Sequence, residues 1–143
     1  EHYSRNTCRW AGDVFTSILN LDPIPYADLR ANNALFGSKG DAAKESTYQE
    51  LEALNGRKDY DLIIIRAVAP VNLNRTLQMY NRAISHLRPE GCLFSTNGLK
   101  DENHFFEELV NGLDYSPEIY ADNPLCEEKY ITDCKIAVWK NSG

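Results

Sequence analysis

The feature that most constrains the fold is an unbroken apolar run, Leu62 to Ile65, inside the stretch DYDLIIIRAVAP. A run this short, rich in β-branched residues and without polar alternation, predicts an interior strand covered on both faces, as strands of parallel sheets are. Arg66 and Pro70 follow at its carboxyl end. Because ligands of open α/β sheets bind at that edge, we expect Arg66 to face a binding crevice.

Apolar periodicity and turn residues predict helices and strands in alternation along the rest of the chain. Helices are predicted at 5–19, 26–37, 42–54, 72–87 and 101–113, with Asn72 and Asp101 as the N-caps of the last two. Strands are predicted at 18–22, 60–66, 92–97, 115–123 and 130–141, with polar turns at 37–41, 88–91 and 122–129. Helical connections imply right-handed crossovers and parallel strands, whereas the last two strands imply a C-terminal antiparallel hairpin. The expected fold is a single α/β domain, residues 1–143, with a Rossmann-like, mostly parallel sheet flanked by helices.

Composition limits the class of partner. The chain is 43% hydrophobic and 25% charged, as globular proteins are, and its formal net charge is −6 at pH 7. Nucleic-acid affinity comes largely from clustered Lys and Arg, and the basic residues here are scattered, so we expect a small-molecule or protein partner rather than nucleic acid. No apolar stretch approaches the ~20 residues of a membrane span, and the first ten residues lack the apolar core of a signal peptide. A cytoplasmic location is the default expectation.

The four cysteines are at positions 8, 92, 126 and 134. They form no CxxC pair and have no histidine at metal-ligand spacing, so the sequence predicts no zinc site. Buried free thiols in a reducing compartment are the expected state. A bridge from Cys126 to Cys134, closing the last hairpin, is expected only if the protein is secreted.

Residues 58–140 resemble the second half of the class I S-adenosylmethionine-dependent methyltransferases. The strand DYDLIIIRAV, a long helix, the turn LRPEG, the strand CLFSTN, a helix and a terminal hairpin follow one another here. That family has a strand beginning with YD or FD, then a helix, then an L-K-P-G-G turn, and its reversed final strand separates it from dinucleotide-binding folds. The resemblance implies binding of S-adenosylmethionine and methyl transfer to a small-molecule or glycan-like acceptor.

The same resemblance implies roles for residues of the first half. Asp22, which ends the first predicted strand, would accept hydrogen bonds from the ribose hydroxyls of the cofactor, since a carboxylate offers several lone pairs to a vicinal diol. Asp41 and Ala42 would match the position beside the adenine. A turn-forming role is the alternative for Asp22, because it precedes a proline.

Two residues at strand ends are candidates for the cofactor or the acceptor. Arg66 would hold the cofactor carboxylate or the acceptor, because its guanidinium offers fixed donors; an ion pair with Asp59, Asp61 or a helix-borne Glu is the alternative. Asn97 would reach a substrate, with a helix-initiating turn as the alternative. No acid or base is assigned, because methyl transfer from a sulfonium depends chiefly on proximity and an in-line approach.

The family's glycine-rich loop after the first strand has no counterpart, because no G-x-G-x-G run occurs in the 143 residues. The chain is therefore expected to be an excerpt of a longer methyltransferase, with an incomplete core, or a domain without cofactor binding. The second case makes it a non-catalytic structural or interaction module. A narrower resemblance, carried by RAVA directly after YDLI, is to GidB-type ribosomal RNA guanine-N7 methyltransferases, which stand as a third alternative.

Overall fold

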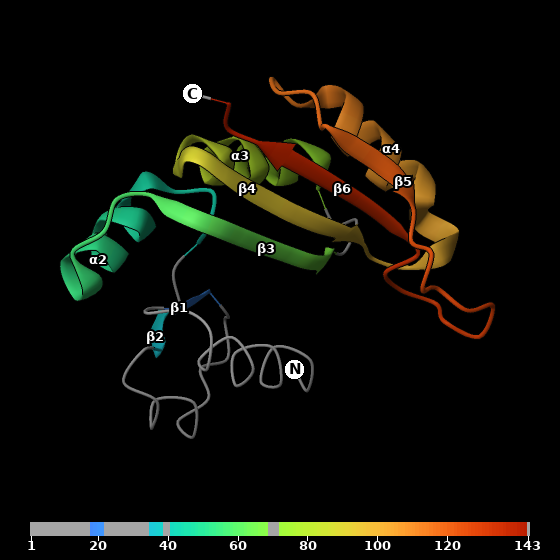
Figure 1. Ribbon diagram of the computed structural model, residues 1–143, viewed down its shortest axis with the longest axis horizontal. Helices are drawn as coiled ribbons and strands as arrows, with labels where there is room; N and C mark the ends of the chain where they lie inside the picture. The colour runs from blue at the N-terminus through green and yellow to red at the C-terminus, as the bar shows by residue number, and fades with distance from the viewer. Residues whose placement is uncertain (1–17, 22–34, 39–40, 69–71, 143) are drawn as a thin grey trace. The chain divides into compact units, whose positions relative to one another are not determined.

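The computed structural model describes residues 18–21, 35–38, 41–68 and 72–142 (Figure 1). The chain divides into two compact units, Glu1–Lys58 and Asp59–Gly143, which are described separately. In the first unit the described residues form two short strands and a helix: β1 (Ile18–Leu21), β2 (Leu35–Ser38) and α2 (Glu45–Asn55). The second unit contains β3 (Tyr60–Val68), α3 (Leu73–Ser85), β4 (Leu87–Asn97), a 3-10 turn η2 (Lys100–Glu102), α4 (Asn103–Gly112), β5 (Ile119–Asp122) and β6 (Lys135–Lys140).

The first unit corrects two helix predictions. β1 and β2 pair in parallel, with Ile18 opposite Leu35. β1 confirms the predicted strand 18–22 over residues 18–21, and it corrects the end of the overlapping predicted helix 5–19, since Ile18 and Leu19 are in the strand. Residues 35–37 are in a strand rather than in the predicted helix 26–37. Strand pairing between distant segments overrides a short apolar periodicity, since propensity is only a weak prior. The rest of both predicted helices lies outside the described residues.

The second unit is a four-stranded mixed sheet in the order β3-β4-β6-β5 (Figure 1). β3 pairs with β4 in parallel, and β6 is antiparallel to both β4 and β5. Helix α3 makes the crossover that a parallel pair requires. Asn72 caps α3, because its side chain accepts a hydrogen bond from the backbone N–H of Arg75. The α/β architecture and its antiparallel C-terminal hairpin are confirmed.

Both helices that follow β3 and β4 pack against the same face of this sheet. Tyr80 of α3 is fully buried there, donates to or accepts from the hydroxyl of Ser95 at 2.5 Å, and packs edge-on against Trp139 with 5.8 Å between ring centroids. Burial raises the pKa of the Tyr80 hydroxyl. Leu109 of α4 is also fully buried. The core of this unit is therefore one layer of side chains between α3, α4 and the sheet.

The expectation that Leu62 to Ile65 is an interior strand covered on both faces is wrong for this unit. Ile63 and Ile65 pack against the core, whereas Leu62 and Ile64 are 37% and 45% exposed. Successive side chains of a strand point to opposite faces, and α3 and α4 cover only one of them. β3 is also the end strand of the four-stranded sheet.

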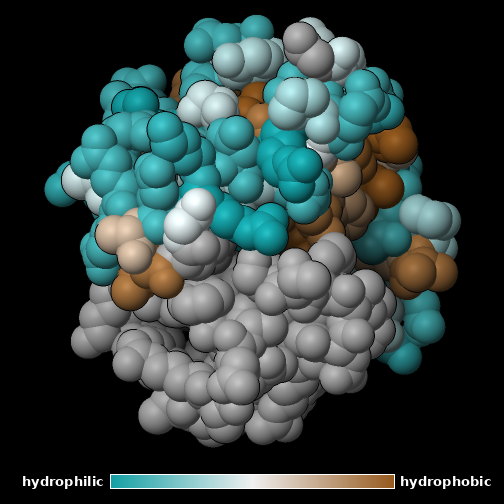
Figure 2. Space-filling view, turned by 60° about the vertical axis from the view of Figure 1, so that its left-hand side comes forward, coloured by the Kyte–Doolittle hydropathy of each residue, from teal (hydrophilic) through white to brown (hydrophobic). Residues whose placement is uncertain are grey.

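Apolar side chains reach the surface elsewhere as well. Figure 2 shows hydrophobic residues, in brown, emerging between hydrophilic ones on one side of the molecule. Among the residues whose burial is described, the most exposed large apolar side chains are Leu125 and Ile131, at 82% and 65%. Both belong to the segment that joins β5 to β6.

The predicted turn 88–91 is instead part of β4. The register passes from Tyr60 opposite Leu87 to Leu62 opposite Cys92, so the intervening residues bulge out of the ladder. Glu90 has a φ of 66°, and its backbone N–H donates to the carbonyl of Asn141 at 2.6 Å. This bond holds the bulge to the residue after β6, which is why the turn residues do not end the strand.

The N-cap prediction for Asp101 is wrong. Asp101 lies inside η2, and α4 begins at Asn103 with Glu102 at the N-cap position and no side-chain cap bond. A preceding 3-10 turn supplies the entry to the helix instead, as such turns often do at helix ends.

The bulge yields a prediction about Gly91. An added Cβ would lie 2.8 Å from the carbonyl oxygen of Tyr60 and 2.9 Å from that of Arg88, both on the backbone. Gly91→Ala should therefore lower the free energy of unfolding by ~1–3 kcal/mol, measured by urea denaturation. Gly112→Ala is the matched control, because its Cβ would meet only the flexible end of Leu77 at 3.1 Å, in a helix that favours alanine. Equal stabilities of the two variants would contradict the assigned close approach.

Candidate binding site at the carboxyl edge of the sheet

The carboxyl ends of β3 and β4 meet at one edge, where Val68 lies opposite Asn97. The segment 123–134, which joins β5 to β6, crosses this edge. Its backbone bonds to the end of β4 and to the segment after it, from Asp133 N–H to the Asn97 carbonyl at 3.3 Å and from Lys100 N–H to the Ile131 carbonyl at 2.5 Å. Polar side chains from β3, β4 and this segment are therefore brought together.

Arg66 and Asp133 form the central pair of this edge. The Arg66 Nε donates to Asp133 Oδ1 at 3.1 Å, and Nη2 donates to Oδ2 at 2.7 Å. The side chains are 35% and 17% exposed. Such a two-point contact fixes the plane of the guanidinium as well as its position. The ion-pair alternative for Arg66 thus has a partner, but it is neither Asp59 nor Asp61.

Two hydroxyl groups complete the surroundings of the Asp133 carboxylate. Thr96 Oγ1 donates to Oδ1 at 2.5 Å, and Thr132 Oγ1 donates to Oδ2 at 3.1 Å. Burial on its own would raise the pKa of the Asp133 carboxyl, but the hydrogen bonds from Arg66 and Thr96 outweigh burial and hold this pKa below its usual value. Asp133 has a φ of 62°, a left-handed conformation that Asp tolerates better than most residues.

Asn97 lies at the same edge but is fully buried. Its Nδ2 donates to Asn103 Oδ1 at 2.5 Å, and its Oδ1 accepts from the backbone N–H of Lys135 at 2.8 Å. Asn103 is the first residue of α4. The side chain of Asn97 thus ties the end of β4 to the start of α4 and the start of β6, as the helix-initiating alternative expects.

The other candidate residues belong to the first unit. Asp41 Oδ1 accepts from the backbone N–H of Ala43 at 2.9 Å, and the Asp41 carbonyl accepts from the hydroxyl of Thr47 at 2.6 Å. Asp41 and Ala42 therefore form the turn that leads into α2. Asp22 follows β1 directly and lies outside the described residues. The structure thus brings Arg66 together with Asn97, and it describes Asp41 and Ala42 in a separate unit.

Sequence reasoning missed Asp133 and Thr96. Asp133 was placed inside the predicted strand 130–141, whereas β6 begins only at Lys135. The apolar run of β6 begins only at Ile136, after a stretch that contains Thr132, Asp133 and Lys135, and this late start is the sequence signal that the residues before it form a loop.

Two further observations concern the described part of the chain only. No cluster of three or more His, Cys, Asp or Glu side chains there is arranged to hold a metal ion. None of the described helices is long and apolar enough to cross a membrane.

No protein-family model matches the chain, and no curated protein sequence is significantly similar to it. Solved structures do resemble it. An rRNA methylase from Streptococcus thermophilus is 12% identical with a TM-score of 0.62, and the match covers 96% of this chain and 80% of that one. A putative rRNA-methylase from Clostridium thermocellum is 14% identical with a TM-score of 0.62, over 94% of this chain and 79% of that one.

A third similar structure contains a ligand. The N-methyltransferase NodS from Bradyrhizobium japonicum WM9, in complex with S-adenosyl-L-homocysteine, is 16% identical with a TM-score of 0.55, over 89% of this chain and 67% of that one. Identities this low establish the fold and nothing finer. The chain therefore has the α/β fold of class I methyltransferase structures.

Proposed function

We propose that the protein binds S-adenosylmethionine at the carboxyl edge of its sheet and transfers the methyl group to a small-molecule or glycan-like acceptor. The observation that carries this proposal is the polar cluster of Arg66, Thr96 and Asp133 at the joint carboxyl ends of β3 and β4. In open α/β sheets this is the edge at which ligands bind. The methyltransferase fold and the S-adenosyl-L-homocysteine in one similar structure support the choice of cofactor.

The residues at this edge suit a ligand with a carboxylate. Arg66 is partly exposed, and Asp133 holds its guanidinium in a fixed plane. A guanidinium fixed in this way is suited to a carboxylate, such as that of the methionine part of the cofactor. Asp22 would accept from the ribose, and Asp41 with Ala42 would contact the adenine. Asn97, proposed for the substrate, would have to exchange the internal bonds that its buried side chain makes.

The proposed chemistry depends on orientation rather than on a protein base. When bound, S-adenosylmethionine supplies a methyl group on a positively charged sulfur. A general base works best with a pKa near the working pH, and the lowered pKa of Asp133 suits it to anchor Arg66 instead. Arg66 and Asp133 would therefore position the reactants. Correct positioning is the main source of rate enhancement in such a transfer.

A non-catalytic role is the second candidate. Arg66 is engaged by Asp133, Asn97 is sealed inside the protein, and the sequence has no G-x-G-x-G run. Each of these observations favours a structural or interaction module that retains the fold without the chemistry. Binding of the cofactor product separates the two candidates.

Ribosomal RNA is a third candidate, as acceptor. Two of the similar structures are described as rRNA methylases, and RAVA follows the YDLI strand here. The net charge of −6 opposes it, because phosphate contacts require clustered basic residues. A small-molecule acceptor in a cytoplasmic protein is the version that we propose.

The first test is calorimetric titration of the whole chain with S-adenosyl-L-homocysteine. We expect saturable heat, and Arg66→Gln should weaken the affinity roughly 10- to 100-fold, because a hydrogen bond to a charged group contributes ~1.5–3 kcal/mol. The matched control is Arg88→Gln. Arg88 pairs with Asp61 at 3.0 Å on the same two strands, but at their opposite ends.

Arg88→Gln should leave the affinity within about twofold of the unsubstituted protein, because its exposed pair contributes little. Circular dichroism should show that both variants are folded. If the unsubstituted protein gives no heat, cofactor binding by this chain is rejected and the non-catalytic candidate is favoured. An equal loss in both variants would remove Arg66 from the site.

The second test concerns Asp133 and acid. Its pKa is lower in the folded than in the unfolded chain, so the charged pair stabilises the fold above the ordinary Asp value of about 4 and this contribution is lost as pH falls through the lower folded-state value. Asp133→Asn should lower the free energy of unfolding at pH 7 by ~1–2 kcal/mol, since Asn tolerates the left-handed backbone but loses the charge. The difference should shrink as pH falls below the ordinary Asp value of about 4, measured by urea denaturation across pH.

Asp61→Asn is the control for this pH series. Asp61 also pairs with an arginine, but its side chain is 65% exposed. Such pairs contribute ~0–1 kcal/mol, so the variant should stay close to the unsubstituted protein at every pH. A difference for Asp133→Asn that persists undiminished in acid would show that the carboxylate charge is not its cause.

A further inference from the structure

Two thiols face each other across the segment 123–134. Cys126 Sγ and Cys134 Sγ are 2.6 Å apart, and both cysteines are free. A disulfide bond is about 2.05 Å long, so the sulfur atoms need to approach by only about 0.5 Å to bond. Among the described cysteines, Cys92 lies away from this segment, on β4. The pair is therefore placed for one specific covalent link.

The backbone of the segment holds both cysteines in place. Asn123 N–H donates to the Cys134 carbonyl at 2.8 Å, and Cys126 N–H donates to the Asn123 carbonyl at 3.0 Å. Asn123 Nδ2 also donates to the Asp133 carbonyl at 2.7 Å. These bonds close the segment onto itself, so the approach of the two thiols does not depend on the thiols alone.

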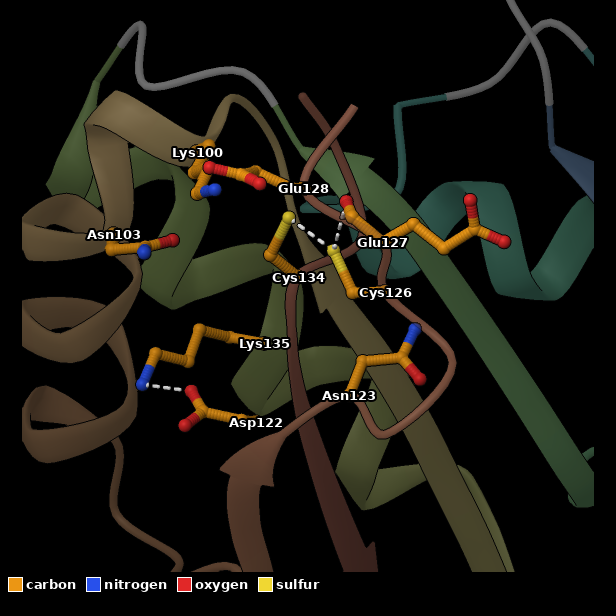
Figure 3. A pocket seen from close by; sticks show the side chains of 9 residues that line it. All are labelled: Lys100, Asn103, Asp122, Asn123, Cys126, Glu127, Glu128, Cys134 and Lys135. Carbon is orange, nitrogen blue, oxygen red and sulfur yellow. Dashed lines mark hydrogen bonds and ion pairs between the residues drawn. The ribbon is translucent and has the colours of Figure 1, made fainter. Parts of the chain in front are cut away.

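A pocket of about 250 Å³ gives solvent access to the pair (Figure 3). Figure 3 shows both sulfur atoms pointing toward each other among polar side chains, with the Lys135–Asp122 ion pair beside them. Cys126 is partly buried, whereas Cys134 is only 8% exposed. A small reagent therefore reaches Cys126 first, and Cys134 lies behind it.

We propose that Cys126 and Cys134 are a redox-modified site, at which low-molecular-weight disulfides such as glutathione disulfide produce an intramolecular disulfide. In the first step, the Cys126 thiolate attacks one sulfur of the reagent, and the other sulfur leaves as a thiolate. In the second, Cys134 Sγ attacks Cys126 Sγ and displaces the second reagent thiolate. The two cysteines lose two protons and two electrons, and one reagent disulfide becomes two thiols.

The environment of Cys134 sets the conditions for the second step. In the reduced protein, hydrogen bonding with Cys126 and then burial raise the pKa of the Cys134 thiol above its ordinary value, and burial still acts once Cys126 carries the reagent. The thiolate is the attacking form, so closure of the bridge should accelerate as pH rises from about 7 to about 9.

The test is peptide mapping of the whole chain after equilibration with glutathione disulfide and alkylation without reduction. Trypsin places Cys126 in peptide 101–129 and Cys134 in peptide 130–135. We expect these peptides to be recovered as one linked species, lighter than their sum by two hydrogen atoms. Recovery of both cysteines as separately alkylated or glutathione-bound peptides would overturn the proposal. Links to Cys8, to Cys92 or between two copies of the chain would overturn it as well.

Two cysteine variants extend the peptide map, and a measurement of thermal unfolding tests the proposal independently of it. Cys92→Ser should leave the linked species unchanged, whereas Cys126→Ser should abolish it. The linked protein should also unfold at a temperature roughly 5 to 10 °C above that of the reduced protein, because the bridge lowers the conformational entropy of the unfolded chain. Equal unfolding temperatures for the linked and reduced protein would contradict a bridge that fits the native segment, even where the Cys126 variant fails to fold.

Discussion

Parallel pairing of β3 with β4 is the constraint from which the rest of the second unit follows. A parallel pair cannot be joined by a tight turn, so the chain must return along the sheet, and α3 makes that return over one face. The pairing also puts the ends of both strands at one edge, next to the start of β6. Arg66 consequently meets Asp133, 67 residues later in the chain. The polar cluster is therefore a product of topology rather than of local sequence.

The sequence predicted those parts of the fold in which local pattern and tertiary contacts agree. The run from Leu62 to Ile65 is a strand, and the stripe that begins after Asn72 is a helix with the expected cap. β1 lies within the predicted strand 18–22, although a predicted helix overlapped its first two residues. β2 was not predicted, because its four residues carry too little periodicity to outweigh the neighbouring helical pattern. The prediction of one domain over the whole chain stays a prediction.

The candidate site was predictable in location and not in its contacts. Strand-end geometry placed Arg66 and Asn97 at one edge, and both lie there. The partner of Arg66 could not be found from sequence, since carboxylates close to it along the chain were the natural candidates. The actual partner, Asp133, lies in the segment that joins β5 to β6. The burial of Asn97 could not be predicted from sequence either. Nothing in the neighbouring residues distinguishes an asparagine whose amide group bonds to other protein groups from one that faces a crevice.

One face of β3 is not covered by α3 or α4, and the fold alone does not identify the function. The apolar run predicted a strand covered on both faces, yet α3 and α4 cover only the face that carries Ile63 and Ile65. A fold hosts many activities, so the site and not the architecture must discriminate between an enzyme and a module that retains only the shape. Here the discriminating feature is whether Arg66, already oriented by Asp133, also engages a ligand.

Asp133 and Cys134 connect the sheet edge to the thiol pair. They are consecutive residues, and yet one side chain bonds to Arg66 while the other faces Cys126. Asn123 bonds to the carbonyl groups of both, and the backbone at Asp133 is in the small left-handed region. One short stretch of backbone thus sets the position of the carboxylate that orients Arg66 and of the thiol that faces Cys126. A change in bonding at Asp133 or at Cys134 therefore affects the backbone stretch that positions the other side chain.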